Sequence, residues 1–540
     1  MGALTLKSFP FELRGWDIEK FESIDPTDGF GTATRVYISK QQIIQIEPDH
    51  SKTVFNPWLN DKSRQFFDAI FGIWNSKNDQ HQSLVLKKEL WQATIQDLLK
   101  TLYLFEQCAA KTQKMHFLTI VFENLGIEMI SLLKIIEQKC SFIKLRRTEN
   151  LNISNDLESN FQLNTAADSS KLKTSTICLL IANNPRYEGS SLNLKLRQRY
   201  LKGNFKCLTL GSLIDLTFPT IAIGTNIKVL KKISEGNSFL CQDFKSAHNP
   251  LIIFGNEFYK QTESKNAIKM LKSLNLFSLT WKGFNTLNST LSETGTQSIA
   301  NFLPLKKKDF EESSSFYFIN VDAQNTANLK KITEAKLLNY STLNKTEQFS
   351  IKKLFLDQNC NARNNQIFVK DFLKLENSKK YTFLPTKMFY ENKETFINTE
   401  GLIKQTNKLI TKRKTRESWK LLRNLFSHIK IEFTDLNFKN THNLLFNTTK
   451  QDNFANFLNF QYCAVEKLDN TNSSISNKLY PFFIYRFNKK FKQTLSKVTD
   501  TKTKYWLDDF FTGGKDEYSK NSLVLANCSK ILRTQSTNFF

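Results

Sequence analysis

One five-residue segment, Asn184-Pro185-Arg186-Tyr187-Glu188, carries residue types that could bind a ligand at a strand end. It follows the apolar run Thr176–Ile181 and precedes Leu192–Tyr200, whose apolar residues recur at helical spacing. Ligands of open α/β sheets usually bind at the carboxyl ends of the strands. The segment could therefore once have held a phosphate-bearing cofactor.

Helix capping explains the same residues without a ligand. Asn184 suits an N-cap, Pro185 suits the first helical position, and Glu188 suits the positive end of the helix dipole. A glutamate in the first turn would also repel an anion. We therefore favour a structural role for the whole segment and expect no cofactor on it.

A second segment, Phe396–Gly401, ends in the triplet Thr399-Glu400-Gly401. The triplet alone is a weak signal for chemistry. Its simplest interpretation is a turn in which Gly401 adopts a positive φ, because glycine has no Cβ to clash there.

Metal-binding and catalytic patterns are absent from the sequence. The histidines form no His-x-x-x-His pair, and the Glu47-to-His50 spacing contains Pro48, which disfavours a helical ligand pair. Gly513-Gly514-Lys515 lacks the earlier glycine of a phosphate loop. No two cysteines are close enough for a Cys-x-x-Cys element. We predict no catalytic residues, no metal site and a reducing compartment. The cysteines are Cys108, Cys140, Cys178, Cys207, Cys241, Cys360, Cys463 and Cys528.

The order of apolar patterns indicates an α/β protein. Residues 1–56 contain short alternating, β-branched runs, which predict a small antiparallel β unit. Helical spacing follows over Trp58–Trp74, Leu90–Leu104 and Met115–Ile136. Apolar runs that alternate with helical segments then predict a doubly wound, mainly parallel sheet. These runs are Thr176–Ile181, Cys207–Leu210, Leu251–Gly255 and Phe316–Ile319.

The order of apolar patterns predicts three regions. We assign 1–56 to the β unit and 57–430 to the α/β region, with a break between two sub-domains near 149–170. We expect 431–540 to be an irregular extension that ends in a docked helix over Ser519–Arg533.

The composition limits the partners of the chain. The 540 residues carry 76 Lys+Arg against 51 Asp+Glu, a formal charge of +25. That field would attract nucleic acid, anionic lipid or an acidic protein. The basic runs are short and no zinc-finger or RNA-recognition signature is present, so we favour protein partners and no nucleic acid. The best apolar stretch, Phe117–Ile136, contains three charged residues and is predicted to be a buried helix rather than a membrane span.

Taken in order, several segments resemble one family, the large iron–sulfur subunit of respiratory complex I. Its C-terminal part is a degenerate relative of molybdopterin oxidoreductases. Asn184–Glu188 is similar to the family's Asn-Pro-Arg segment and Asn398–Gly401 to its Asn-Thr-Glu-Gly segment. The other matching segments or residues are Gly2–Thr5, Arg14–Asp17, Glu22–Asp25, Trp58–Arg64, Asn193, Arg197 and Gln405. The resemblance covers residues 2–430, with a weaker match at Ser519–Leu532.

This resemblance implies a structural subunit on the matrix side of the mitochondrial inner membrane, in the peripheral arm of complex I. The absence of a transit peptide suggests that the chain is encoded in the mitochondrial genome. The family's cluster-binding cysteines would precede residue 2. We therefore expect no cofactor in this chain, and iron–sulfur clusters in a separate chain that forms the N-terminal half of the same subunit.

The departures from the family leave two alternatives. Leu402 stands where the family has arginine, which removes a cation suited to a pterin phosphate, and the first cysteine is Cys108. A free-standing molybdopterin oxidoreductase is the first alternative, and it requires bound metal and pterin. A basic nucleic-acid-binding protein is the second, and its binding would weaken steeply with salt.

Overall fold

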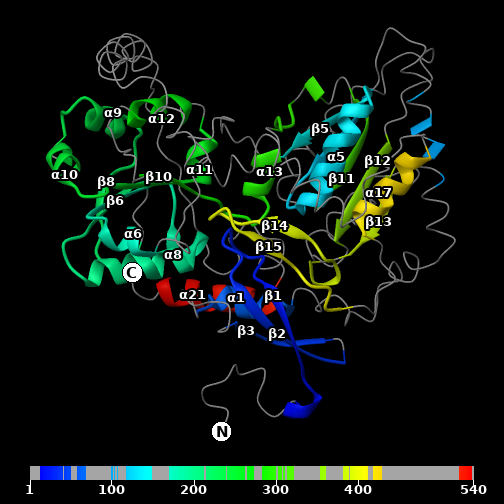
Figure 1. Ribbon diagram of the computed structural model, residues 1–540, viewed down its shortest axis with the longest axis horizontal. Coiled ribbons are helices and arrows are strands. Elements are labelled where there is room, and N and C mark those ends of the chain that lie inside the picture. Colours follow the sequence, from blue (N-terminus) through cyan, green and yellow to red (C-terminus); the bar gives the residue numbers. More distant parts are fainter. Residues whose placement is uncertain are drawn as a thin grey trace, which may run out of the picture.

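The described part of the chain contains two five-stranded sheets, a three-stranded sheet and a two-stranded hairpin (Figure 1). The computed structural model describes residues 13–40, 42–49, 58–68, 96, 99–100, 102–103, 106, 117–148, 169–211, 215–238, 240–261, 264–272, 283–299, 302–306, 308–309, 313–321, 353–359, 381–387, 389–410, 417–428 and 522–537. Most of the helix predicted over Leu90–Leu104, most of the break predicted near 149–170, and residues 431–521 lie outside this set.

The N-terminal sheet confirms the predicted small antiparallel unit. Strands β1 (Glu19–Ile24), β2 (Ala33–Ser39) and β3 (Gln42–Pro48) pair in sequence order, each antiparallel to the next. Alternation along β2 and β3 turns one set of β-branched side chains into a core cluster that also contains Phe66 and Tyr390. A short 3-10 turn, η1 (Gly15–Asp17), precedes β1.

The first five-stranded sheet is entirely parallel and has the order β10-β9-β6-β7-β8. Helices cover both of its faces, and each face has its own apolar cluster. This arrangement confirms the predicted doubly wound type. The strands are β6 (Ile177–Ile181), β7 (Lys206–Leu210), β8 (Ile221–Gly224), β9 (Leu251–Gly255) and β10 (Phe284–Leu287). The helices are α6 (Ser169–Thr174), α7 (Pro185–Glu188), α8 (Ser190–Leu201), α9 (Lys228–Ser234), α10 (Leu240–Ser246), α11 (Asn256–Tyr259) and α12 (Ser264–Lys272).

The second five-stranded sheet is also parallel, with the order β13-β12-β11-β4-β5. Strands β4 and β5 precede the strands of the first sheet in the sequence, and β11, β12 and β13 follow them. The chain therefore leaves the second sheet after β5 and returns to it at β11. The strands are β4 (Phe117–Phe122), β5 (Ile143–Arg147), β11 (Ser313–Ile319), β12 (Lys353–Asn359) and β13 (Tyr381–Thr386). Its core cluster includes side chains of α5 (Ile127–Lys139) and α17 (Ser418–Ser427), and α13 (Glu293–Ile299) contacts α5.

The helix prediction over Phe117–Ile136 is wrong for its first part. The stretch Phe117–Ile136 divides into strand β4 and the first ten residues of α5, with Gly126 at the helix N-cap. The sequence Phe-Leu-Thr-Ile-Val-Phe is apolar at almost every position, so periodicity alone does not separate a buried strand from a buried helix. Within the predicted Trp58–Trp74 span, the described residues 58–68 contain α1 (Asp61–Gln65), which begins after Asn60, and a further helical residue, Asp68, while 69–74 lie outside the described set.

The hairpin of β14 (Thr395–Ile397) and β15 (Ile403–Gln405), preceded by η3 (Phe389–Glu391), lies between the N-terminal sheet and the two larger sheets (Figure 1). A final helix, α21 (Leu523–Thr537), packs against α1 and occupies the segment in which we predicted a docked helix. Among the described residues, no helix combines the length and the apolar character needed to cross a bilayer.

Candidate functional site

The Asn184 segment begins helix α7 in the way that capping predicts. The Asn184 Oδ1 accepts a hydrogen bond of 3.1 Å from the backbone N–H of Arg186, and Pro185 is the first helical residue. The backbone N–H of Asn184 donates to Glu188 Oε2 at 3.1 Å. The side-chain oxygens of Asn184 and Glu188 therefore accept hydrogen bonds from backbone N–H groups at the start of the helix, which is a structural role.

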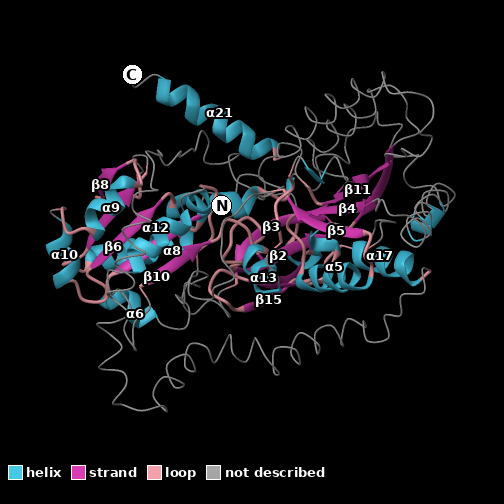
Figure 2. Cartoon of the chain, turned by 90° about the horizontal axis from the view of Figure 1, so that it is seen from above, coloured by secondary structure: helices cyan, strands magenta, loops and turns pink. Residues whose placement is uncertain are grey.

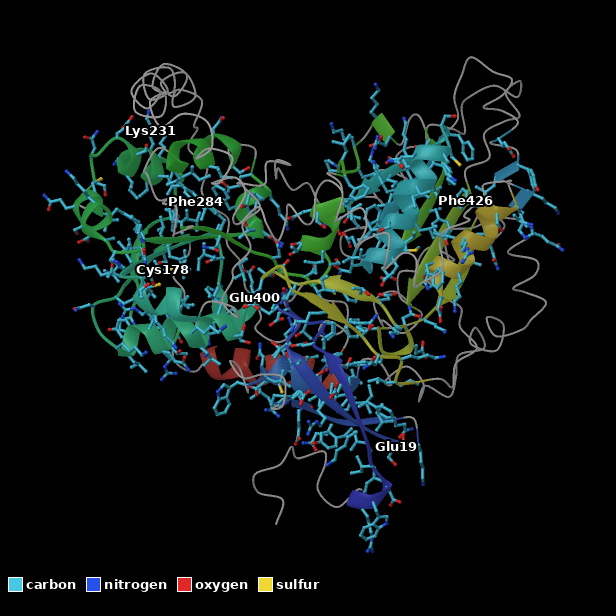
Figure 3. All side chains as sticks on the ribbon, viewed as in Figure 1. Glu19, Cys178, Lys231, Phe284, Glu400 and Phe426 are labelled. Atoms are coloured by element: carbon cyan, nitrogen blue, oxygen red, sulfur yellow. The ribbon has the colours of Figure 1, made fainter. Side chains whose placement is uncertain are left out.

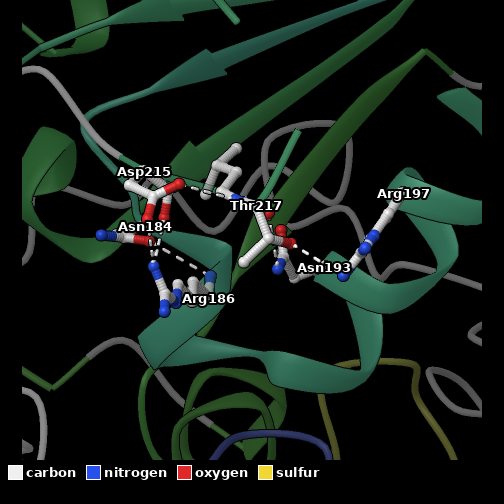
Figure 4. A network of polar contacts seen from close by, with 7 residues as sticks. Asn184, Arg186, Asn193, Arg197, Asp215 and Thr217 are labelled. Carbon is white, nitrogen blue, oxygen red and sulfur yellow. Dashed lines mark hydrogen bonds and ion pairs between the residues drawn. The ribbon is translucent and has the colours of Figure 1, made fainter. Parts of the chain in front are cut away.

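Arg186 holds the loop that follows the neighbouring strand β7 (Figure 4). Its Nη1 donates to Asp215 Oδ2 at 2.6 Å and to the Asp215 carbonyl oxygen at 3.2 Å. Asp215 Oδ1 in turn accepts from the backbone N–H of Thr217 at 2.9 Å. That hydrogen bond, followed by the charge of Arg186, lowers the pKa of Asp215.

The same loop is held from helix α8, where the sequence had suggested Asn193 and Arg197. Asn193 Nδ2 donates to the Leu216 carbonyl at 3.2 Å, and Arg197 Nη1 donates to Thr217 Oγ1 at 3.5 Å. Thr217 has a φ of +69°, which is unfavourable for a β-branched residue. The motif thus fixes a strained loop at the carboxyl edge of the first sheet.

The Thr399-Glu400-Gly401 triplet forms the turn of the β14–β15 hairpin, and Gly401 has a φ of +80°. Asn398 Oδ1 closes this turn by accepting from the backbone N–H of Leu402 at 2.8 Å. The predicted turn conformation is therefore present. Leu402 follows Gly401 on the exposed side of this turn, where its side chain is 36% exposed.

The turn also binds the loop between β1 and β2. Thr399 donates twice to the Gly29 carbonyl, from its backbone N–H at 2.8 Å and from Oγ1 at 2.9 Å. Asn398 Nδ2 donates to the Phe30 carbonyl at 2.9 Å. The Phe30 ring lies against Gly189, where α8 begins: a Cβ on Gly189 would come within 2.6 Å of it. The two motifs are therefore connected through Phe30.

An ion pair joins the two motifs directly. Lys195 Nζ on α8 lies 4.0 Å from Glu400 Oε1, and the two side chains are 10% and 8% exposed. Burial lowers the pKa of Lys195, and the Glu400 charge opposes that shift. Figure 3 shows Glu400 at the centre of the molecule, between the two large sheets. Arg186 and Lys195 each face a carboxylate of this chain, so these residues do not fit the phosphate of a bound pterin.

Two clusters of buried carboxyl groups carried no recognisable sequence signal. In the β1–β2 loop, burial raises the pKa of Asp25. Burial and the neighbouring Asp25 raise the pKa of Asp28 to about 8. Asp25 accepts hydrogen bonds from Thr27 and Ser63. The sequence Asp25–Gly29 is typical of an ordinary exposed turn, and only its first residue belongs to a segment with a family resemblance, Glu22–Asp25.

The second carboxyl cluster joins helix α5 to the hairpin. Glu128 Oε2 accepts from the Thr395 backbone N–H at 3.1 Å, and Glu394 Oε1 accepts from Asn392 Nδ2 at 3.1 Å. Burial, the nearby Glu128 and then Glu417 raise the pKa of Glu394 to about 8. Within the described residues, no group of three or more His, Cys, Asp or Glu is placed to hold a metal ion.

Two family models match the chain. Residues 107–428 match the molybdopterin oxidoreductase model, and residues 18–68 match the model described as NADH-ubiquinone oxidoreductase NDSU1/NuoG-like, 4Fe-4S domain. The second match corrects our expectation that iron–sulfur chemistry belongs wholly to another chain, because it assigns an iron–sulfur domain to this one. Residues 18–68 contain no cysteine. The matched segment thus does not itself supply the cysteine thiolates that usually hold such clusters.

The similar proteins are named as subunits of NADH-ubiquinone oxidoreductase or NADH dehydrogenase. The NADH-ubiquinone oxidoreductase 75 kDa subunit of Reclinomonas americana is 25% identical over 79% of this chain and 59% of its own length. The mitochondrial 78 kDa subunit of Neurospora crassa is 24% identical over 61% of this chain and 45% of its own length. The iron-sulfur protein 1 of Solanum tuberosum is 22% identical over 63% of this chain and 45% of its own length. The chain thus spans about half the length of these relatives.

The family assignment combines the fold with these matches. Two parallel five-stranded sheets, the first with helices on both faces, agree with the doubly wound, mainly parallel type that the sequence predicted. The molybdopterin oxidoreductase model matches 107–428, which is more than half of the 540 residues. The chain belongs to the molybdopterin oxidoreductase family.

Proposed function

We propose that this chain is a mitochondrial subunit of respiratory complex I, the NADH:ubiquinone oxidoreductase. The observation that carries the proposal is the order of the two family matches. An iron–sulfur domain of the NADH-ubiquinone oxidoreductase type at 18–68 precedes the molybdopterin oxidoreductase region at 107–428. Relatives named as subunits of this oxidoreductase, which match up to 79% of the chain, support the same assignment.

Within the complex, the chain acts as a structural subunit of the peripheral arm, on the matrix side of the inner membrane. The contacts of the motif residues support this role. Asn184 and Glu188 cap a helix, Arg186 fixes a loop, and Glu400 pairs with Lys195. These side chains make intrachain contacts, so they build the scaffold instead of forming an active site.

A separate polypeptide supplies the remaining iron–sulfur domains of the subunit and binds to this chain. The support for this part of the proposal is the resemblance of Gly2–Thr5 to the segment that follows the last cluster-binding cysteine of the complex I subunit family. In this arrangement the chain holds the partner in place while electrons pass from NADH to ubiquinone.

Native separation of solubilised mitochondrial membranes tests the proposal. An antibody against this chain should detect it in the band that stains for NADH dehydrogenase activity. Mass spectrometry of that band should find peptides of this chain together with those of a second chain rich in cluster-binding cysteines. Detection of the chain at its own mass, with a fully assembled active band that lacks it, contradicts the proposal.

A free-standing molybdopterin oxidoreductase is the second candidate, and the match at 107–428 favours it. This function requires stoichiometric molybdenum and pterin in the purified chain. Elemental analysis and the fluorescence of the oxidised pterin measure both. The pairing of Arg186 with Asp215 and of Lys195 with Glu400 makes this the weaker candidate.

A further inference from the structure

Helix α21 is fixed to the body of the protein by one of its sides. Leu525 is fully buried in the cluster that contains Ile43 and Phe66, and Ser529 one turn later is 4% exposed. The backbone N–H of Val524, at the start of the helix, donates to Asp68 Oδ2 at 2.9 Å. The helix therefore has a defined orientation, with a docked side and an outer side.

Over the residues of α21 whose side chains are described, the outer side exposes three apolar side chains beside the polar Asn527 and the basic Lys530. Leu523, Val524 and Ile531 are 50%, 41% and 56% exposed. At about 100° per residue these three side chains lie within about 100° of arc, facing away from Leu525. An amphipathic helix needs one apolar side to dock on its own protein, and a helix that is apolar on both sides is usually buried on both. Figure 2 shows α21 at the outside of the molecule, with no described element beyond it.

A further exposed aromatic residue borders the same core cluster. Trp58 is 63% exposed, and its neighbour Leu59 packs against the cluster that Leu525 enters. Exposed large apolar side chains that gather around one element are typical of a protein interface, and tryptophan often dominates the binding energy there. Trp58 is thus an exposed aromatic residue next in sequence to one that packs on the cluster against which α21 docks.

The charge of α21 and of the whole chain indicates which kind of partner suits the outer face of the helix. The sequence of Leu523–Thr537 has no acidic residue, and Lys530 is exposed beside the apolar face. The whole chain carries a formal charge of +25. A partner with acidic residues around an apolar groove complements both features. A helix that lies on anionic lipid usually carries a basic-rich polar face, whereas α21 contains two basic residues, Lys530 and Arg533.

We propose that the outer face of α21, defined as Leu523, Val524, Lys530 and Ile531, docks into an acidic-rimmed apolar groove on a neighbouring protein subunit. This inference rests on the proposed membership of complex I. The helix thereby has two contacts: Leu525 holds it to its own chain, and the outer face holds the chain to the assembly.

The test compares tagged full-length variants in cells that contain the complex. The variant Val524→Glu/Ile531→Glu places two negative charges on the outer face without changing a buried residue. We expect the amount of tagged chain in the NADH dehydrogenase band to fall about tenfold or more, because charge is introduced into an apolar contact. The control Leu201→Glu/Ile221→Glu changes side chains that are 72% and 47% exposed on α8 and β8, and it should enter the band like the unchanged chain.

The outcomes separate this inference from the proposed function. Absence of the unchanged chain from the band overturns both. Entry of the unchanged chain and of both variants at equal levels overturns the docking surface alone. Circular dichroism of the purified variants verifies that they fold. Flotation of the purified chain with phosphatidylserine vesicles, lost in the α21 variant, would assign the face to a membrane. A dimer in light scattering that the same variant abolishes would assign it to a second copy, and either result overturns the proposal.

Discussion

Lys195 Nζ lies 4.0 Å from Glu400 Oε1, and this contact joins the two segments that the sequence had singled out. Lys195 belongs to helix α8, which follows the Asn184 segment, and Glu400 belongs to the turn of the β14–β15 hairpin. Both side chains are at least nine-tenths buried. The contact therefore bridges the first large sheet and the hairpin that packs on the N-terminal unit.

Removal of one partner of this ion pair should destabilise the chain more than removal of both. Lys195→Met removes the ammonium from beside the buried Glu400 carboxylate, and Glu400→Gln removes that carboxylate from beside the buried Lys195. We expect each single variant to lower the free energy of unfolding by about 2 kcal/mol, and the double variant to lower it by less than either single variant does. Urea unfolding of the four proteins, monitored by circular dichroism, gives the coupling energy.

A surface pair provides the control for this cycle. Lys231 and Glu235 lie 3.8 Å apart on adjacent helical turns, but their side chains are 34% and 36% exposed. The same substitutions there should change the stability by less than about 1 kcal/mol. Equal coupling energies for the two pairs would contradict a special role for the Lys195–Glu400 contact.

Gly29 should tolerate no side chain, because three segments meet at its Cα. A Cβ there would lie 2.2 Å from the Asn288 carbonyl oxygen and 2.5 Å from Thr399 Oγ1. Backbone would have to move, and the two hydrogen bonds from Thr399 to Gly29 would lengthen. We expect Gly29→Ala to lower the free energy of unfolding by about 2 to 3 kcal/mol. Gly15→Ala is the matched control, since nothing lies within 4 Å of its added Cβ.

Replacement of Thr217 by a residue that accepts a positive φ should stabilise the folded chain. Its φ of +69° crowds the branched Cβ against the backbone. Asparagine adopts this conformation at lower cost, so Thr217→Asn should raise the free energy of unfolding by about 1 kcal/mol. Thermal unfolding measures the change. A loss of stability would mean that the Thr217 contact with Arg197 outweighs the backbone strain.

Local sequence patterns predicted the parts of the fold that depend on neighbouring residues. Strands β6 and β9 stand out because they are buried on both faces and flanked by turn residues. The N-cap at Asn184 follows from its residue type and the proline after it. Strand β4 was mistaken for a helix because it leads into the apolar helix α5 with little polar sequence between them. Edge strand β5 was missed because Lys144, Arg146 and Arg147 interrupt its apolar residues.

The candidate site could not be assembled from the sequence, because its contacts join distant segments. Arg186 meets Asp215 across 29 positions and Thr399 meets Gly29 across 370. Periodicity and capping rules describe neighbours along the chain and contain no information about such pairs. The iron–sulfur domain match at 18–68 cannot be predicted from cysteine spacing, because that segment contains no cysteine.

Glu394 should make the stability of the chain depend on pH. Its pKa is raised from the ordinary value of 4.5 to about 8 in the folded state, first by burial and then by Glu128 and Glu417. Between those two values the folded chain holds a proton that the unfolded chain releases. The stabilising contribution is therefore complete below about pH 4.5 and is lost as the pH rises through about 8.

Glu394→Gln should reduce this pH dependence while preserving the local contact. The Gln Oε1 can still accept the hydrogen bond that Glu394 receives from Asn392 Nδ2 at 3.1 Å. We expect the variant to gain stability relative to the unchanged chain as the pH rises from about 5 to about 8, because it removes a group that must either keep its proton or bury a second charge beside Glu128. Urea unfolding across this range measures the difference. An equal effect of the substitution at both ends of the range would show that Glu394 does not hold the proton, and that another carboxyl group, such as Asp28, dominates the pH dependence.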